Sequence, residues 1–469
     1  MAVLDVVVMA AGKGTRMKSR LPKVLHRLAG RPMVQHVLDT VAPLGARRVV
    51  VVTGHGAALV ESALTDAMEA PGAAPFELRF ARQEPQLGTG HAVQQAAPLL
   101  AAEGTVLVLN GDVPLIAAAT LRAMQAAAAT GALALLTIAL DDPTGYGRIV
   151  RDEGGAVRGI VEHKDATEAQ RAIRETYTGV MAVPAARLAG WLARLSNTNA
   201  QGEYYLTDIV AMAVADGVPV VGVPTIDAVE VAGVNSPVQL AALERAFQRR
   251  NADLLMEAGT RLADPARIDV RGTLACDADV EIDVGCVFEG AVHLGEGVRI
   301  GAHCVIADAR IAAGAVVHPF THIAGERAGV QVGEGAIVGP FARLRPGARL
   351  GRDVHIGNFV EVKNSTMADG AKANHLAYLG DAVVGARVNY GAGSITANYD
   401  GAYKHTTTIG DDVHVGSNCV LVAPLTLGAG TTVAGGSTIT KDTPPGTLAV
   451  ARGRQVSIAN WKRPSKTAG

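Results

Sequence analysis

The sequence predicts an α/β protein in two parts, a doubly wound, mostly parallel sheet followed by a parallel β-helix. Three observations carry this prediction. Apolar runs of β type alternate with Ala-rich stretches over residues 1 to about 230. A six-residue repeat of aliphatic side chains fills the last third of the chain. A single capped helix separates the two patterns.

In the first part, the pattern predicts strands at 3–9, 48–53, 105–109 and 132–139. Helices are expected at 33–41, 91–102 and 117–130. Strands that alternate with helices form parallel sheets with helices on both faces. Ligands of such sheets bind beyond the carboxyl ends of the strands.

The connecting helix begins at Ser236-Pro237, with serine as the N-cap and proline in the first helical position. Its apolar pattern continues to Gly259. We therefore expect a domain at 1–235, a linker helix at 236–260 and a β-helix with a basic tail at 261–469.

The repeat places aliphatic residues six apart, often with glycine directly after them. A period of six matches neither the 3.6 of a helix nor the alternation of a strand, and it is typical of short strands on the faces of a prism. The two longest runs are Val332, Val338, Leu344, Leu350, Ile356 and Val362, then Ile409, Val415, Leu421, Leu427, Val433 and Ile439.

The rhythm breaks between Val362 and Val384 and again between Thr396 and Ile409. Breaks in a solenoid are insertions on one face and are often functional. The first break contains His375 beside Tyr378, and the second contains 398–404. A histidine is more often structural than catalytic, but its place at a break makes His375 a candidate.

Composition bounds the function. The 469 residues carry a net charge of −1, which argues against a nucleic-acid partner, since such proteins show a basic face. Four cysteines without CxxC spacing predict reduced, buried thiols and hence a cytoplasmic protein. No apolar stretch approaches 18 residues, so no membrane association is expected.

The string from Met9 to Met17 directly follows the first strand. Gly12 and Gly14 would let backbone N–H groups approach a polyphosphate, and Arg16 and Lys23 would add positive charge. A GxG pair alone is mostly a turn. Together with Leu21-Pro22-Lys23-Val24-Leu25, however, this string resembles the signature of sugar-nucleotide pyrophosphorylases, which usually have leucine where Met9 stands.

Segments at 83–91, 110–114, 145–148, 160–164, 175–179 and 230–235 extend the resemblance. It implies in-line nucleotidyl transfer, in which a sugar 1-phosphate attacks the α-phosphorus of a nucleoside triphosphate. Asp112 and Asn235 would bind Mg²⁺, which prefers oxygen ligands. The implied nucleotide and sugar residues are Met9, Ala10, Ala11, Gly12, Arg16, Lys23, Gln83, Gly88, Thr89, Asn110, Gly111, Asp112, Gly147, Glu162, Tyr177 and Asn235.

The whole chain resembles the bacterial bifunctional family of N-acetylglucosamine-1-phosphate uridyltransferases and glucosamine-1-phosphate N-acetyltransferases. The strings that carry this lie at 339–347, 357–363, 375–381 and 398–401. The resemblance implies a Rossmann-like nucleotidyltransferase domain, a left-handed β-helix, UTP and acetyl-CoA as co-substrates, and a homotrimer with acetyltransferase sites between subunits.

By the same resemblance His375 would be the general base of acetyl transfer. Gly435 replaces the usual alanine of the family, a harmless change if only backbone is used there. Arg345, Lys363, Tyr378, Asn389 and Lys404 would bind the sugar phosphate, and Ala392, Asn398, Tyr399, Ser417, Gly435 and Arg452 would bind acetyl-CoA.

Tyr177 departs from the family's Glu-x-Asn-Thr-Gly segment. Its ring could swing aside, so that water or Glu162 holds the sugar, or it could reshape the pocket toward a different sugar 1-phosphate. We expect the first, so that N-acetylglucosamine 1-phosphate stays the preferred substrate. One alternative is a single-activity pyrophosphorylase with a regulatory or oligomerising β-helix, which His375, Tyr378 and Lys404 argue against. Another is a structural solenoid with a degenerate first domain, which the intact Gly12, Lys23, Asp112 and Asn235 argue against.

Overall fold

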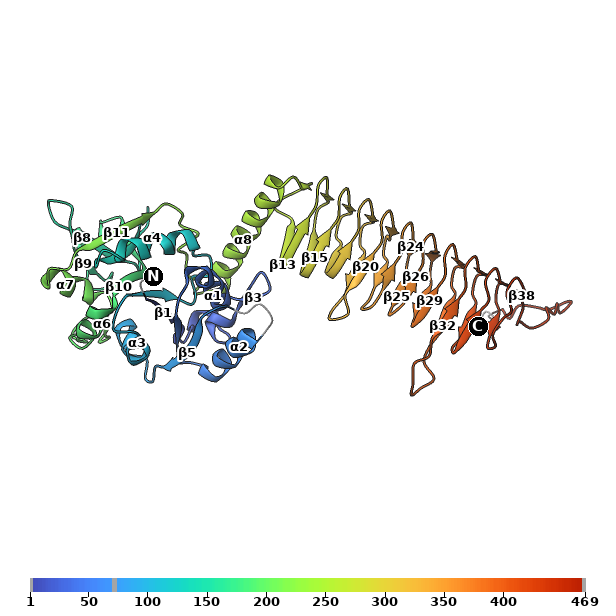
Figure 1. Ribbon diagram of the computed structural model, residues 1–469, viewed down its shortest axis with the longest axis horizontal. Coiled ribbons are helices and arrows are strands. Elements are labelled where there is room, and N and C mark those ends of the chain that lie inside the picture. The colour runs from blue at the N-terminus through green and yellow to red at the C-terminus, as the bar shows by residue number, and fades with distance from the viewer. Residues whose placement is uncertain (1–2, 70–73, 466–469) are drawn as a thin grey trace. The chain divides into compact units, whose positions relative to one another are not determined.

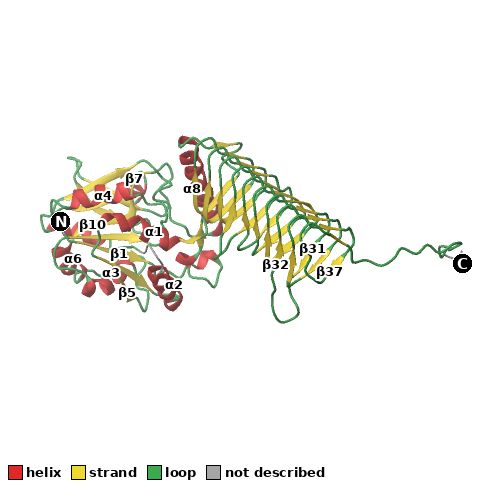
Figure 2. Ribbon diagram, turned by 45° about the vertical axis from the view of Figure 1, so that its right-hand side comes forward, coloured by secondary structure: helices red, strands yellow, loops and turns green. Residues whose placement is uncertain are grey.

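The computed structural model describes residues 3–69 and 74–465 (Figure 1). The chain divides into two compact units, Met1–Phe247 and Gln248–Gly469. Among the described residues, helices lie before Ala258, short strands joined by turns follow up to Ala449, and an irregular tail comes after them (Figure 2). The α/β class expected from the alternating patterns is confirmed.

The first unit is built on a mixed, mostly parallel sheet. The strand order is β11-β7-β10-β6-β1-β4-β5, with β8 and β9 added beside β10. Only β8, β9 and β10 run antiparallel to their neighbours. The strands are β1 (Leu4–Met9), β4 (Arg48–Thr53), β5 (Glu77–Arg82), β6 (Thr105–Asn110), β7 (Leu133–Ala139), β8 (Gly147–Arg151), β9 (Val157–Val161), β10 (Glu175–Pro184) and β11 (Val220–Thr225); a small hairpin pairs β2 (Arg27–Leu28) with β3 (Arg31–Pro32).

Helices cover both faces of this sheet. Val6 and Val8 of β1 pack in one hydrophobic cluster, while Val7 between them packs in another, as a doubly wound sheet requires. The helices are α1 (Met33–Val41), α2 (Ala57–Glu69), α3 (Thr89–Ala96), α4 (Ala118–Ala128), α5 (Glu168–Arg171), α6 (Ala185–Leu192) and α7 (Asp208–Ala215). Helix α3 ends earlier than predicted because Pro98 places the next residues in a 3₁₀ turn.

Helix α8 (Pro237–Glu257) joins the two patterns. The N–H of Gln239 donates to Ser236 Oγ at 3.3 Å, which is the predicted N-cap. Leu243 packs with Met17 and Leu28 in a cluster of the first unit, whereas Ala252 belongs to the β-helix core. The division between the units therefore falls inside this helix rather than at either of its ends.

The second unit is a parallel β-helix. One face is a single parallel sheet of β12 (Arg261–Leu262), β14 (Glu281–Ile282), β16 (Arg299–Ile300), β18 (Val316–Val317), β21 (Ile337–Val338), β24 (His355–Asn358), β27 (Lys372–His375), β30 (Asn389–Tyr390), β33 (His414–Val415), β36 (Thr432–Val433) and β38 (Leu448–Ala449).

The remaining strands form the other sheet. They are β13 (Ile268–Cys276), β15 (Cys286–Leu294), β17 (Val305–Ile311), β19 (His322–Ala324), β20 (Val330–Val332), β22 (Arg343–Leu344), β23 (Arg349–Leu350), β25 (Glu361–Lys363), β26 (Thr366–Met367), β28 (Tyr378–Gly380), β29 (Ala382–Val384), β31 (Ile395–Ala397), β32 (Thr407–Ile409), β34 (Val420–Val422), β35 (Leu425–Leu427) and β37 (Thr438–Ile439). All twelve aliphatic residues of the two six-residue runs are buried in one continuous core.

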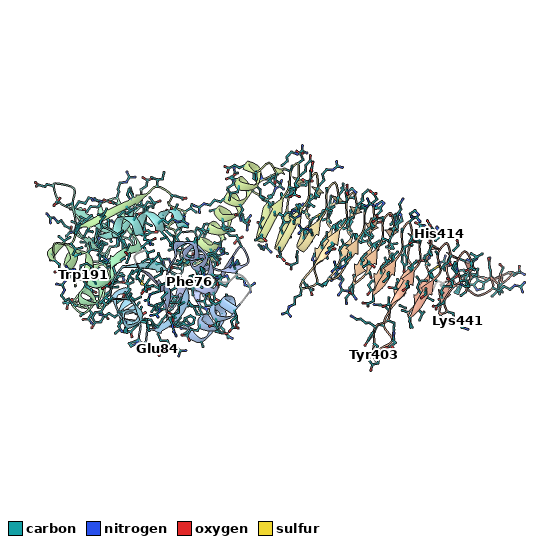
Figure 3. The ribbon with its side chains drawn as sticks, viewed as in Figure 1. Phe76, Glu84, Trp191, Tyr403, His414 and Lys441 are labelled. Carbon is teal, nitrogen blue, oxygen red and sulfur yellow. The ribbon has the colours of Figure 1, made fainter. Side chains whose placement is uncertain are left out.

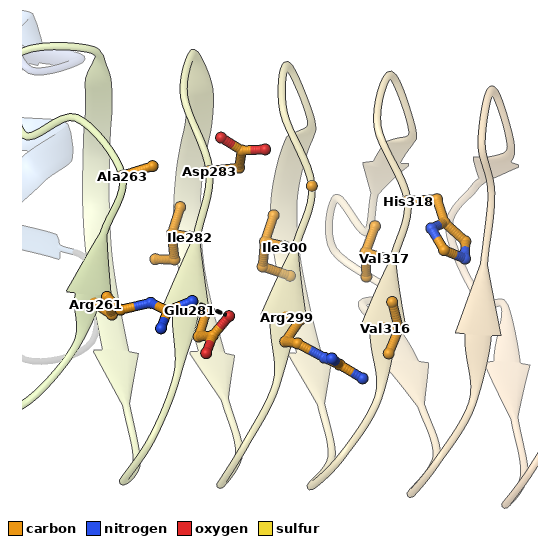
Figure 4. A pocket seen from close by; sticks show the side chains of 11 residues that line it. Arg261, Ala263, Glu281, Ile282, Asp283, Arg299, Ile300, Val316, Val317 and His318 are labelled. Carbon is orange, nitrogen blue, oxygen red and sulfur yellow. Dashed lines mark ion pairs between the residues drawn. The ribbon is translucent and has the colours of Figure 1, made fainter.

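Successive coils stack equivalent residues in files (Figure 4). Ile282, Ile300 and Val317 form a buried file, and Glu281, Arg299 and Val316 form its outward neighbour. An open hollow of about 490 Å³ lies on this face. None of the candidate site residues lines it, so the search for a site turns to other parts of the protein.

One of the two predicted insertions is wrong. After Val362 the inward-facing residues of successive strands are Met367, Ala373, Leu379 and Val384. Two of these steps, to Met367 and to Val384, are one residue shorter than the six-residue repeat, so nothing is inserted. His375 ends strand β27 on a regular coil. The second break is a true insertion, in which Tyr399 and Lys404 pair antiparallel. Figure 3 shows Tyr403 on the loop that leaves the coils there.

Within the two described ranges, no helix is both long and apolar enough to cross a membrane.

The two units should function separately, because each has its own hydrophobic core. We expect fragments 1–257 and 236–469, each keeping all of α8, to fold, as measured by circular dichroism and cooperative melting. The first should retain pyrophosphate-releasing activity and the second CoA-releasing activity. Loss of both activities from two folded fragments would contradict independent sites.

Candidate functional sites

The predicted phosphate loop borders a cavity at the carboxyl ends of β1 and β6. Its volume is about 310 Å³. Ten predicted residues line it: Met9, Ala10, Ala11, Gly12, Lys23, Gln83, Gly88, Thr89, Asn110 and Asp112. Arg16 lies exposed on the loop and Gly111 is buried behind it, and neither lines the cavity. Gln86 and Glu203 line it as well and were not predicted.

The Lys23 ammonium joins the two predicted metal ligands. Its Nζ lies 2.5 Å from Asp112 Oδ2 and 3.1 Å from Asn235 Oδ1. These two oxygens come from residues 123 positions apart, on the loop after β6 and the segment before α8. The N–H of Val234 donates to the carbonyl of Asp112 at 3.0 Å and holds the two segments together. The fold thus directs two hard oxygens to one cation.

This donor set fits Mg²⁺. The ion commonly takes one or two protein oxygens and completes its shell with water and phosphate oxygens. Within the described chain no cluster of three or more His, Cys, Asp or Glu side chains could hold a metal alone. The Asp112 carboxylate and the Asn235 amide oxygen already share one cation, the Lys23 ammonium. Mg²⁺ bound to the substrate phosphates would use the same two oxygens.

A second hollow of about 220 Å³ shares Met9, Thr89 and Asn110 with the first. Gly147, Glu162 and Tyr177 line it, as predicted for the sugar end. The Thr207 hydroxyl donates to Glu162 Oε1 at 2.9 Å. Burial raises the pKa of Glu162 despite that hydrogen bond.

Tyr177 does not swing away from this hollow. Its side chain is buried and lines the hollow with Glu162, and its backbone in β10 pairs with that of Gly147 in β8. Within the described part of the chain the buried hydroxyl has no hydrogen-bond partner. Burial, and then the nearby Glu162 carboxylate, raise the pKa of Tyr177 well above its ordinary value.

Arg148 was missed by the sequence prediction. Its guanidinium is only 1% exposed, donates to the carbonyls of Tyr146 and Arg171, and lies 3.3 Å from Nδ1 of His163. It thereby ties Tyr146, beside Gly147, to the segment that follows Glu162. The string Gly145-Tyr-Gly-Arg148 gives no signal of this, because an arginine beside turn residues is usually exposed.

In the second unit, His375 has a defined partner that was also missed. Nδ1 of the exposed His375 lies 3.0 Å from Oδ1 of Asn358, its neighbour on the preceding coil. An amide oxygen only accepts, so Nδ1 carries the proton and Nε2 bears the free lone pair. A histidine in this state can take a proton through Nε2.

A cationic cluster is formed by Lys363 at the end of β25, Arg345 just after β22 and Lys404 on the inserted loop. The Lys404 ammonium, then partial burial and the Arg345 guanidinium, lower the pKa of Lys363. Arg345 also forms an ion pair with Glu361 at 2.8 Å. Cations held close together repel one another, and a bound anion would relieve this repulsion. Arginine and lysine are common phosphate-binding residues.

Two further predicted residues stand near this cluster in the coils. Tyr378 pairs with Glu361 across neighbouring strands and is half-buried. Asn389 is exposed, and its amide lies 3.1 Å from Nδ1 of His414 on the next coil.

The residues predicted for acetyl-CoA run down the last coils. The N–H of Asn418 donates to Ala392 O at 2.7 Å, that of Gly436 donates to Ser417 O at 2.8 Å, and Arg452 Nη1 donates to Gly435 O at 2.8 Å. Two backbone hydrogen bonds and one from the Arg452 guanidinium therefore join these positions to neighbouring segments of the last coils and the tail. Asn398 is buried with its amide on Asp381, whereas Tyr399 on the inserted loop is 62% exposed.

Comparison with known proteins agrees with this two-site arrangement. Residues 6–196 match the MobA-like NTP transferase domain, and residues 329–364 and 406–441 match the bacterial transferase hexapeptide family. The chain is 72% identical over its full length to the bifunctional protein GlmU of Acidovorax ebreus (strain TPSY), whose full length is also covered. Similar proteins are the bifunctional GlmU of Albidiferax ferrireducens, 71% identical over 99% of this chain and all of that protein, and that of Azoarcus sp. (strain BH72), 58% identical with the same coverage.

This chain belongs to the bifunctional GlmU family. It is therefore an enzyme of UDP-N-acetylglucosamine biosynthesis with two transferase activities. One acetylates glucosamine 1-phosphate with acetyl-CoA, and the other transfers UMP from UTP to N-acetylglucosamine 1-phosphate and releases pyrophosphate. The alternative of a single activity with a passive β-helix is set aside.

Substitution of Lys404 by Met should raise the pKa of Lys363, because the Lys404 ammonium is the main cause of its lowering. In the unaltered GlmU-family chain, Lys363 loses its proton at a lower pH than an ordinary lysine. The phosphate binding expected of Lys363 should therefore weaken at a lower pH. The KM for glucosamine 1-phosphate should rise at alkaline pH as Lys363 loses its proton, and in the variant this rise should begin at a higher pH. Arg343→Met, which removes a cation paired with Glu361, should not change the pH at which KM rises. If Lys404→Met does not change this pH either, the interaction between Lys404 and Lys363 is refuted.

Gly435 and Gly416 offer a matched pair. A Cβ on Gly435 would approach nothing closer than Ser417 O at 3.4 Å, an ordinary contact, whereas one on Gly416 would meet the Gly435 backbone N at 2.6 Å. We expect Gly435→Ala to leave melting temperature and the KM for acetyl-CoA unchanged. Gly416→Ala should destabilise the β-helix by about 1–3 kcal/mol in a denaturant titration. Equal effects of the two changes would contradict the coil spacing.

Proposed function

We propose that the cavity beside Lys23 is the uridyltransferase site. The observation that carries this is the meeting of Asp112, Asn235 and the Lys23 ammonium beside the glycine loop. Gly12 and its neighbours would place backbone N–H groups against the triphosphate, with Lys23 and Arg16 balancing its charge. Mg²⁺, held by Asp112 and Asn235, would neutralise charge on the phosphates and the departing pyrophosphate.

The reaction needs no protein nucleophile. A phosphate oxygen of the sugar 1-phosphate attacks the α-phosphorus of UTP, and the bond to the bridging oxygen of pyrophosphate breaks. The chain contributes by aligning the two substrates in adjoining hollows and by fixed positive charge. The shared wall of Met9, Thr89 and Asn110 lies where the reacting phosphates would meet.

For the sugar, we propose that Glu162 and Gly147 hold N-acetylglucosamine 1-phosphate. Glu162 is fixed by Thr207 and partly buried, so its oxygens are oriented before the sugar arrives. Tyr177 forms a wall of this hollow rather than an open gate.

We propose that His375 is the general base of acetyl transfer. Nε2 would take a proton from the glucosamine nitrogen as that nitrogen attacks the thioester carbonyl of acetyl-CoA, and CoA leaves as the thiolate. The Asn358 hydrogen bond supports this role because it keeps the proton on Nδ1. Arg345, Lys363 and Lys404 would hold the phosphate, Tyr378 and Asn389 the sugar, and Ala392, Asn398, Tyr399, Ser417, Gly435 and Arg452 would line the path of acetyl-CoA.

We further propose a homotrimer in the cytoplasm. Four rings, His303, Phe320, Phe341 and Phe359, stack at 5.2–5.5 Å between centroids along one corner of the β-helix. The three phenylalanines are 48–56% exposed, and association between copies would cover them. The four free cysteines suit a reducing compartment.

Two substitutions test the assignment in one preparation. Asp112→Ala should abolish Mg²⁺-dependent pyrophosphate release and leave CoA release near normal. His375→Ala should do the reverse, with a loss in acetyl transfer of roughly 10²–10⁴-fold for a missing general base. If either change lowers both reactions equally in folded protein, the site assignments are wrong.

A further inference from the structure

The Gln83 amide is held by two acceptors. Gln83 follows β5 directly, is only 3% exposed and lines the cavity of the first unit. Its Nε2 lies 2.8 Å from the carbonyl oxygen of Gly88 and 3.3 Å from Nδ1 of His91. A carbonyl oxygen can only accept, so the amide nitrogen, not its oxygen, faces Gly88.

With its amide nitrogen engaged, the Gln83 side chain can contact a ligand only as a hydrogen-bond acceptor. The amide nitrogen has two hydrogens, and Gly88 and His91 account for both. Within the described residues no donor contacts Gln83 Oε1, so this oxygen is offered as an acceptor. The imide N3–H of uracil is a donor and matches it, whereas N3 of cytosine is a lone pair and would be repelled.

His91 is itself held in place. It lies in the first turn of α3, where Gly90 N–H donates to Tyr204 O at 2.8 Å and Thr89 Oγ1 accepts from Leu206 N at 3.1 Å. Its ring lies 6.3 Å from that of Tyr204. Acceptance through Nδ1 requires the tautomer with its proton on Nε2.

We propose that His91 is a positioning residue for nucleobase choice, which acts by fixing the Gln83 amide so that Oε1 faces the base. This inference rests on the proposed placement of UTP in the cavity. Without the His91 acceptor, one amide hydrogen is released and can turn toward the ligand, where a cytosine N3 would accept it. Discrimination between UTP and CTP then falls although the catalytic groups are intact.

The test compares kcat/KM for UTP and CTP in the full-length enzyme. His91→Phe keeps a ring of similar size without the acceptor, and the UTP:CTP ratio should fall by roughly three- to tenfold, the range of one neutral hydrogen bond. His91→Asn, whose Oδ1 can replace Nδ1, should restore the ratio. An unchanged ratio in His91→Phe, or an Asn variant that behaves like the Phe variant, would overturn the proposal.

Controls separate this role from packing and from the proposed function. Tyr204→Leu removes the neighbouring ring but no acceptor and should leave the ratio unchanged; a fall as large as that of His91→Phe would assign the effect to packing and overturn the proposal. If His91→Phe does not fold, His91→Leu answers the same question. Gln83→Leu tests the placement of the base: UTP turnover and discrimination unaffected by this change would contradict the proposed nucleotide site itself. Acetyl transfer in each preparation reports the integrity of the second unit.

Discussion

In-register parallel pairing between coils is the constraint on which the second site depends. Each coil hydrogen-bonds to the next with equivalent residues aligned, so a side chain's face and height follow from its position in the repeat. Asn358 lies under His375 for this reason, as Glu361 lies beside Tyr378. A slip of the register by one residue would move every side chain to another face. The buried aliphatic files fix the register and therefore also hold the polar site together.

The first unit uses a different constraint, the meeting of strand ends. The carboxyl ends of β1 and β6 are adjacent because these strands pair in parallel from Leu4 to Met9. The glycine loop, Asn110 and Asp112 are thereby brought to one edge of the sheet. Asn235 joins them because the Val234 N–H donates to Asp112 O and the Lys23 ammonium donates to Asn235 Oδ1.

The fold could be predicted from the sequence, since the aliphatic period and the alternation of strands and helices are local signals. The candidate site residues came from the family resemblance, and ten of those expected for the nucleotide line one cavity. The insertion expected around His375 was wrong. Two steps of the repeat there have five residues instead of six, and in the sequence this looks the same as an interruption of the six-residue period. Asn358, Arg148 and the role of His91 could not be found this way. Their importance lies in contacts made by single side chains across strands or loops, and such contacts leave no periodic trace.

The stacked phenylalanines have a consequence for the behaviour of the protein in solution. Phe320, Phe341 and Phe359 all adopt positive φ, which costs a non-glycine residue conformational energy, and about half of each residue stays exposed to water. With a net charge of −1, copies of the chain have almost no overall repulsion to keep them apart. In the proposed trimer, association through this strip would be driven by dehydration of the rings, and charge screening by added salt would change it little.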